Sequence, residues 1–275
     1  MEQAKLNSLK KTAAQIRLDI LEEIHAASSG HPGGSLSIAE IITYLYFEEM
    51  NVDPANPKWA DRDRFVLSKG HTAPALYAAL AEKGFFSKDE LCKLRHVDSF
   101  LQGHPDMKGT AGIDMSTGSL GLGFSTACGM ALAAKIDGKD YRTYTIVGDG
   151  ESEEGQVWEA AMFAAHYKLD NLCVILDWNG LQIDGPVTEV MNPTPHDKKF
   201  EAFGFHVISI DGHDFDAIEA AFAEAKSVKG KPTVIIAKTV KGKGVSYMEN
   251  QVGWHGSAPN DEQYAQGVAE IKATM

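Results

Sequence analysis

The chain has 275 residues and a formal net charge of −12, with 44% hydrophobic and 23% charged residues. These proportions are typical of a globular protein and exclude an intrinsically disordered chain. The acidic balance and the lack of a clustered block of Lys and Arg argue against nucleic acid as the main partner, because phosphate backbones are bound by basic clusters.

Cysteine usage and hydropathy indicate the cellular compartment of the protein. Three cysteines, Cys92, Cys128 and Cys173, lie in apolar patterns without CxxC spacing, which predicts reduced core residues and a cytoplasmic protein. The N-terminal segment is polar and amphipathic, unlike a signal peptide, and no apolar run approaches the length of a membrane span. We therefore expect no membrane as a partner.

The predicted elements alternate along the chain. Apolar residues at helical spacing predict helices over 5–27 and 38–50, separated by a Gly/Pro-rich loop. Strands are predicted at 64–68, 144–147, 171–177, 206–210 and 233–239, and helices at 73–84, 123–135, 157–167 and 215–227. Short apolar strands separated by helices indicate a single α/β domain, 1–275, with a parallel sheet covered by helices on both faces. The loop 95–118 is unusually long, which favours a functional role.

The segment "GDGESEEGQVWEA" stands where a buried strand turns into a helix. Gly148 and Gly150 permit close backbone approach on either side of Asp149, whose carboxylate suits a hard divalent cation. A helix start near Gly155 would turn free N–H groups toward a phosphate at the same place. The motif is therefore consistent with a metal-bridged diphosphate, although an aspartate that only caps the helix would look the same.

A second polar group follows the next strand. Asn179, in "WNGLQIDG", would emerge at the carboxyl end of a strand near the first. It could join Asp149 on the metal, with the carbonyl of Leu181 as a third protein ligand. Alone, Asn179 would be read as a turn residue.

Four histidines lie in glycine-flanked loops. They are His31 in "SGHPGG", His71 in "SKGHT", His104 in "QGHPD" and His255 in "GWHG". Imidazole can bind phosphate or hydroxyl oxygens and move protons near neutral pH. For any one of them, a structural turn histidine is an alternative interpretation, and we assign that role to His213 in "DGHD".

Other nucleotide-binding motifs fail on context. "GLGFST" follows no predicted strand and has Thr126 in place of the third glycine of a dinucleotide fingerprint. "KGKG", which begins at Lys241, lacks the spacing of a P-loop. No nucleophile elbow or zinc pattern is present.

Taken together, the motifs resemble those of one family. The span from "GDG" through "DWNGLQIDG" is similar to the thiamine diphosphate signature, and "SGHPGGSLS", "SKGH", "GHPD" and "STGSLGLG" resemble transketolase loops in the same order. The resemblance covers essentially the whole chain. It implies the thiamine diphosphate-binding fold, specifically the diphosphate-binding domain.

The resemblance also implies roles for individual residues. It assigns Asp149, Asn179 and the Leu181 carbonyl to Mg²⁺ or Ca²⁺. It implies that a larger set of residues binds thiamine diphosphate: His71, Gly118, Leu120, Gly148, Asp149, Gly150, Glu154, Asn179 and Ile183. His31, His104 and His255 would line the sugar channel as catalytic residues. Glu154, a fourth catalytic residue by this resemblance, would lie at the contact with a partner chain, near the aminopyrimidine.

The sequence departs from the family pattern at two residues and in length. Ser119 stands where full-length transketolases usually have Pro, and Leu122 where they have Gln. The chain also stops at Met275, near where the pyrimidine-binding domain of the family would begin. We therefore expect the pyrimidine-binding and C-terminal domains on a separate chain, in an α2β2 split transketolase. It would transfer a two-carbon ketol unit between sugar phosphates of the pentose phosphate pathway.

Alternatives remain within and outside this chemistry. One is a synthase that condenses pyruvate with glyceraldehyde 3-phosphate to 1-deoxyxylulose 5-phosphate, and another is the α subunit of a 2-oxo acid dehydrogenase. "GHPD" favours transketolase over both. A non-catalytic homologue that only binds diphosphate ligands is the alternative from a different class.

Overall fold

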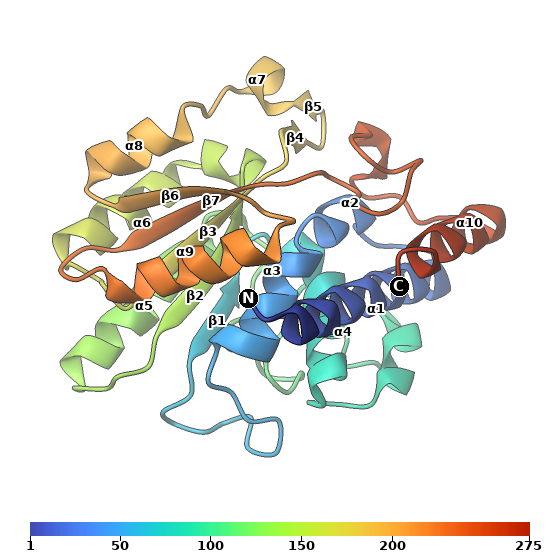
Figure 1. Ribbon diagram of the computed structural model, residues 1–275, viewed down its shortest axis with the longest axis horizontal. Coiled ribbons are helices and arrows are strands. Elements are labelled where there is room, and N and C mark those ends of the chain that lie inside the picture. Colours follow the sequence, from blue (N-terminus) through green and yellow to red (C-terminus); the bar gives the residue numbers. More distant parts are fainter.

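A five-stranded parallel sheet forms the centre of the computed structural model, which describes all residues, 1–275. The strand order is β1-β2-β3-β7-β6 (Figure 1). The strands are β1 (Arg64–Leu67), β2 (Thr143–Gly148), β3 (Leu172–Trp178), β6 (His206–Asp211) and β7 (Thr233–Lys238). The predicted α/β class and parallel sheet are confirmed.

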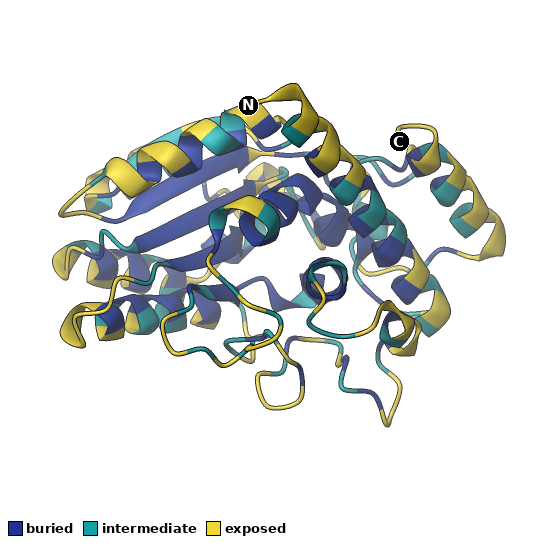
Figure 2. Cartoon of the chain, turned by 60° about the horizontal axis from the view of Figure 1, so that its bottom comes forward, coloured by how far each residue is buried: buried dark blue, intermediate teal, exposed yellow.

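Two cores lie on the two faces of this sheet, because neighbouring side chains of a strand point in opposite directions. Val66, Val147 and Val174 pack in a core with α5 (Leu122–Ile136), α6 (Gly155–His166) and α8 (His196–Phe203). Their neighbours, such as Ile146 and Ile175, belong to a larger core. Its helices are α1 (Gln3–Ala27), α3 (Ala39–Tyr44), α4 (Ala73–Lys83) and α9 (Phe215–Ser227). Strands β1, β2, β3 and β7 are buried almost throughout, whereas the edge strand β6 is only partly buried (Figure 2).

Several elements were not predicted, including α8, which has eight residues. The Gly/Pro-rich loop contains a helical turn, α2 (Pro32–Leu36), because Pro32 suits the first position of a helix. The predicted helix 38–50 is divided in the structure into α3 and a π-helical turn, Leu45–Glu49, that follows it directly. After β3 come a hairpin, β4 (Leu181–Gln182) and β5 (Gly185–Pro186), and then α7 (Val187–Val190). The last helix, α10 (Asp261–Lys272), begins with a capping box at Asn260.

The expectation for the cysteines is wrong at one position. Cys128 and Cys173 are buried, but Cys92 is exposed. Cys92 lies in a 3-10 turn, Lys88–Lys93, whose only buried residue is Leu91, so a short apolar pattern there does not produce a buried face. All three cysteines are free thiols.

The longest helix, α1, has 25 residues and packs along α3, α4 and α10. It buries polar side chains as well as apolar ones, including Arg17, Asp19 and Glu23. Neither α1 nor any other helix combines the length and apolar character that crossing a membrane requires.

The carboxyl ends of four strands bring the chemically interesting loops to one edge of the sheet. β1 leads into a 3-10 turn, Gly70–Thr72, and β2 leads into another, Gly150–Glu153. β3 ends one residue before Asn179, and β7 ends three residues before Lys241. This is the edge at which ligands bind in parallel α/β folds.

Candidate active site

A cavity of about 370 Å³ lies at this edge of the sheet. Most of the residues predicted for the site line it: His71, Leu120, Gly148, Asp149, Gly150, Glu154, Asn179, Leu181, Ile183 and His255. The remaining predicted residues, His31, His104 and Gly118, are not part of the lining. Segments more than 180 residues apart in the chain, from His71 to His255, therefore meet around one space.

Asp149 and Asn179 are brought together because β2 and β3 are neighbours in the sheet, with Gly148 opposite Asp177. The carboxylate of Asp149 accepts hydrogen bonds from the backbone N–H groups of Gly150, at 2.8 Å, and of Gly180. Burial and the negative charge of Asp177 raise the pKa of Asp149 to about 7. The side chain is thus a buried acid, and a nearby cation would stabilise its charged form.

Glycine is required in the turn after Asp149. A Cβ atom on Gly150 would lie 2.8 Å from the Cβ atom of Gln182, which belongs to the hairpin that follows Asn179. The absence of a side chain therefore lets the β4–β5 hairpin cross directly over the turn. In this arrangement the oxygen of the Asn179 side chain accepts a hydrogen bond of 3.1 Å from the N–H of Leu181.

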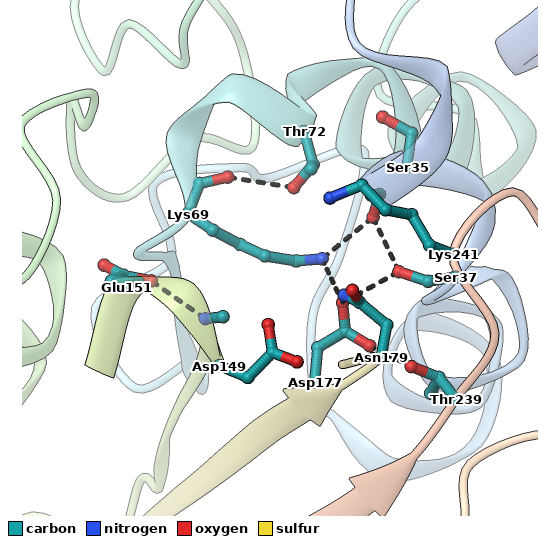
Figure 3. A network of polar contacts seen from close by, with 12 residues as sticks. Ser35, Ser37, Lys69, Thr72, Asp149, Glu151, Asp177, Asn179, Thr239 and Lys241 are labelled. Atoms are coloured by element: carbon teal, nitrogen blue, oxygen red, sulfur yellow. Dashed lines mark hydrogen bonds and ion pairs between the residues drawn. The ribbon is translucent and has the colours of Figure 1, made fainter. Parts of the chain in front are cut away.

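A buried ion pair between Lys69 and Asp177 lies next to Asn179 (Figure 3). The ammonium of Lys69 lies 2.6 Å from Oδ2 of Asp177, and the two side chains are 3% and 0% exposed. Oδ2 of Asp177 also accepts hydrogen bonds from Ser37 Oγ, at 2.8 Å, and from the amide of Asn179, at 2.9 Å. Thr239 donates to its other oxygen. Asp177 therefore holds the Asn179 amide group with its nitrogen turned inward.

The second buried lysine, Lys241, contributes positive charge to the cavity itself. Its ammonium donates to the carbonyl of Leu181 at 3.0 Å and lies 3.0 Å from Nδ1 of His255. Burial lowers the pKa of Lys241 to about 8, although the charge of Asp149 opposes the shift.

Neither lysine was predicted from the sequence, for different reasons. Lys69 lies two residues before His71, inside a motif in which the histidine is the more conspicuous group. Lys241 begins "KGKG", which fails as a P-loop and was given no other role. A buried lysine leaves no periodic signal, since Lys is normally a surface residue.

Three of the loop histidines form a cluster next to Lys241. The ring centroids of His31, His71 and His255 are 5.1 to 5.4 Å apart. Burial lowers the pKa of His31 to about 4, with a smaller contribution from the charge of Arg95. Burial and the charge of Lys241 lower the pKa of His255 to about 3. At neutral pH these rings are uncharged, so each can donate one hydrogen bond and accept another.

His104 and Gly118 lie beside this group rather than in the lining. A Cβ atom on Gly118 would lie 3.2 Å from Cδ2 of His104, so the two residues of the long loop pack on each other. Gly118 has a φ of +155°, a value that favours glycine. His104 is exposed, with burial and Arg95 lowering its pKa.

His213 has the structural role that was expected. Its Nδ1 lies 2.9 Å from Oε2 of Glu40, and its Nε2 accepts a hydrogen bond from the N–H of Val240. Arg17 donates to the same oxygen of Glu40. This group ties α1 and α3 to the end of β7, outside the cavity.

Exposed side chains form the rim of the cavity. Glu154 is exposed and its carboxylate makes no side-chain hydrogen bond, although its residue caps α6. Ile183, on the turn of the hairpin, is 61% exposed. Leu122, at the start of α5, is 50% exposed but lies outside the lining of this cavity. The helix start near Gly155 was expected to turn N–H groups toward a phosphate. In the structure the 3-10 turn Gly150–Glu153 borders the cavity instead of the first turn of α6.

The donor chemistry of the cavity fits a diphosphate held through a divalent cation. Asp149, Asn179 and Leu181 offer a carboxylate, an amide oxygen and a backbone carbonyl, which are the ligands that hard cations prefer. The set contains one carboxylate, and the structure has no cluster of three or more His, Cys, Asp or Glu side chains arranged for a metal. Lys241 adds a positive charge that suits phosphate oxygens.

Comparison with known proteins identifies the family. Residues 8–273 match the protein family described as "Transketolase, thiamine diphosphate binding domain". The chain belongs to the transketolase family. Its thiamine diphosphate-binding domain therefore spans nearly the whole sequence, as the motifs predicted, and the cofactor of this family is thiamine diphosphate.

The relatives divide by length. A 6-deoxy-6-sulfo-D-fructose transketolase subunit of a Clostridium strain is 50% identical over 264 residues, which cover 96% of each chain. A subunit of the apulose-4-phosphate transketolase of Phocaeicola vulgatus is 43% identical over 97% of this chain and 94% of that protein. Human transketolase is 45% identical over 98% of this chain, but the match covers 43% of the human protein.

A solved structure gives the same result. A crystal structure of transketolase from Campylobacter jejuni superimposes with a TM-score of 0.91 and 34% identity, covering 96% of this chain and 42% of that chain. The chain thus corresponds to a whole subunit in some transketolases and to less than half of the polypeptide in others.

Proposed function

We propose that this chain is the N-terminal, cofactor-binding subunit of a two-subunit transketolase. In the reaction, a two-carbon ketol unit passes from a ketose phosphate to an aldose phosphate. The observation that carries the proposal is the meeting of Asp149, Asn179 and Leu181 at one cavity in a chain of the transketolase family. The near full-length match to two relatives named as transketolase subunits supports the division into subunits.

The cavity residues receive the cofactor as follows. Asp149, Asn179 and the Leu181 carbonyl hold Mg²⁺ or Ca²⁺, and the cation and Lys241 neutralise the diphosphate. His71, Gly148 and Gly150 border the diphosphate. Leu120 and Ile183, with Gly118 behind, border the rings of the cofactor. This assignment is supported by the shared cavity and by the buried carboxylate of Asp149 within it.

The protein contributes binding and proton handling. When bound, thiamine diphosphate supplies a nucleophilic carbon that takes up and releases the two-carbon unit. His31, His104 and His255 bind the sugar hydroxyls and move protons there. The low pKa values of His31 and His255 keep both rings neutral, so that each can act as donor or acceptor.

The partner completes the site. Glu154 is exposed at the cavity rim with a free carboxylate, where a second chain can contact it near the aminopyrimidine. We assign residues 1–275 to one diphosphate-binding domain and the pyrimidine-binding and C-terminal domains to a separate chain, in an α2β2 assembly. We place the enzyme in the cytoplasm, in pentose phosphate metabolism.

The relatives bear on the reaction class and on the substrate. Each relative described above is named a transketolase or a transketolase subunit, which favours ketol transfer over the synthase reaction. The two subunit relatives carry in their names a sulfonated and a phosphorylated sugar. We therefore propose sugars with an anionic end group as the substrate class.

Calorimetry of the purified chain tests the cofactor assignment. Asp149→Ala should weaken binding of thiamine diphosphate with Mg²⁺ by more than about tenfold, because the variant removes the only carboxylate of the cation site. Asp184→Ala is the matched control, since Asp184 is an exposed aspartate of the neighbouring hairpin. Equal affinities of the wild type and Asp149→Ala would contradict the assignment.

A second experiment tests the division into subunits. Pull-down from native extract should recover a stoichiometric companion with a pyrimidine-binding domain. The pair should convert xylulose 5-phosphate and ribose 5-phosphate, while the chain alone should not. Conversion by the chain alone at ordinary enzymatic rates would show that the two-subunit proposal is wrong.

A further inference from the structure

Glu151 lies two residues after Asp149 but turns its side chain into the protein, where only 3% of the residue is exposed. One carboxylate oxygen accepts hydrogen bonds from the N–H of Gly121, at 2.8 Å, and from the hydroxyl of Ser68. The other accepts from the N–H of Gly148, at 3.0 Å. One side chain thus contacts the ends of β1 and β2 and the start of α5.

Ser68 extends this contact into α5. Its Oγ accepts a hydrogen bond of 3.0 Å from the N–H of Phe124, and its hydroxyl donates a hydrogen bond to Glu151. A Cβ atom on Gly123 would lie 2.6 Å from the Cα atom of Ser68, so the helix start is pressed against the end of β1. The first N–H groups of a helix have no partner within the helix, and Glu151 and Ser68 supply partners from outside it.

The geometry determines the charge of Glu151. All three contacts of its carboxylate are hydrogen-bond donors, and the two backbone N–H groups among them cannot accept a proton from a neutral acid. Burial raises the pKa of Glu151 above its usual value, although these three donors and the charge of Lys69 oppose the shift. The carboxylate at the N-terminus of α5, a helix of 15 residues, also has a favourable interaction with the helix dipole.

We propose that Glu151 is a positioning residue of the cofactor site, which holds the turn 148–150 and the loop 118–121 at a set separation. The turn carries Asp149, and the loop carries Leu120, which lines the same cavity. Gly121 has a φ of +82°, a backbone conformation that favours glycine at the position Glu151 contacts. The inference rests on the proposed function only in naming thiamine diphosphate as the ligand whose binding depends on this positioning.

Amide hydrogen exchange of the cofactor-free full chain tests the positioning role directly. Glu151→Gln replaces one acceptor oxygen by a donor and removes the charge. Exchange of the Gly121 and Gly148 amides should rise by about tenfold or more, as expected for loss of a hydrogen bond to a charged group. Amides of β7, on the far side of the sheet centre, should exchange as in the wild type. Glu159→Gln, the same change at an exposed position of α6, is the control.

Calorimetry on the same variants then measures the consequence for the site. Glu151→Gln should weaken binding of thiamine diphosphate with Mg²⁺ by about tenfold, and Glu159→Gln should not change it. If the wild type binds no cofactor, the proposed function fails, while the exchange data still decide the role of Glu151. If Glu151→Gln exchanges like Glu159→Gln, or if all core amides exchange faster together, the positioning role is wrong.

Ser68→Ala provides a second variant that keeps the buried carboxylate and its two backbone contacts. It removes the hydroxyl that bridges Glu151 to Phe124. Exchange of the Phe124 amide should rise selectively, and cofactor affinity should fall by less than in Glu151→Gln. Unchanged exchange at Phe124 in this variant would overturn the proposal even if Glu151→Gln does not fold.

Discussion

The ion pair between Lys69 and Asp177 allows a quantitative test of how the site is held together. Both side chains are almost fully buried, and Asp177 accepts four hydrogen bonds, from Lys69, Ser37, Asn179 and Thr239. Lys69→Met would leave three neutral donors on a buried carboxylate with no adjacent cation. The methionine would keep most of the packing of the lysine stem, so the variant isolates the loss of charge.

The expected cost follows from breaking a buried pair on one side. Such changes reduce the free energy of unfolding by about 3–5 kcal/mol, which is a large part of the about 5–15 kcal/mol of a typical domain. Lys135→Met is the matched control, because Lys135 forms a comparable pair with Asp170, at 2.9 Å, with side chains 36% and 25% exposed. An exposed pair contributes about 0–1 kcal/mol.

Urea unfolding at neutral pH, followed by circular dichroism, measures both values. The double variant Lys69→Met, Asp177→Asn should be more stable than Lys69→Met alone, because the amide carries no charge to bury. Lys69 lowers the pKa of Asp177 in the wild type, so this carboxylate contributes stability that is lost as the pH falls through its lowered pKa. In Lys69→Met only the neutral donors oppose the effect of burial, so the pKa of Asp177 should rise and the variant should recover stability as the pH falls. A cost equal to that of Lys135→Met, or additive effects in the double variant, would refute the reasoning.

Two further predictions concern groups outside the cavity. Glu23 is fully buried, neither of its carboxylate oxygens has a partner, and burial and the charge of Asp19 raise its pKa well above the usual value. Glu23→Met should therefore raise the free energy of unfolding at pH 8 by about 1–3 kcal/mol. The difference should shrink toward pH 5, because the wild type gains stability as Glu23 takes up a proton; a variant less stable than the wild type at pH 8 would contradict this prediction. Titration of the native protein with a thiol reagent should modify Cys92 alone, since Cys128 and Cys173 are buried and burial raises the pKa of each to about 12; rapid reaction of a second thiol in the folded protein would count against the structure.

Local patterns in the sequence predicted much of the architecture. Apolar runs separated by helical periodicity were sufficient for the five strands and most of the longer helices, and the positions of Asp149 and Asn179 followed from strand ends alone. The helices α8 and α10 were missed, because each buries only two residues. Short elements were missed, among them α2 and the β4–β5 hairpin, because they have too few residues to show a period. Cys92 was misplaced for the same reason, since six residues of a 3-10 turn do not define a buried face.

What the sequence by itself determined is the edge of the sheet at which the cavity forms and most of the residues that line it, because both depend on residue type and on the order of elements along the chain. Only the tertiary structure decided how the charges are paired. Lys69 meets Asp177 across 108 positions of sequence, and Lys241 meets Leu181 across 60. A buried lysine is stable only where folding supplies a carboxylate or carbonyl partner from another strand end. No local pattern encodes that meeting, so the groups that hold the cavity together became visible only once the sheet was assembled.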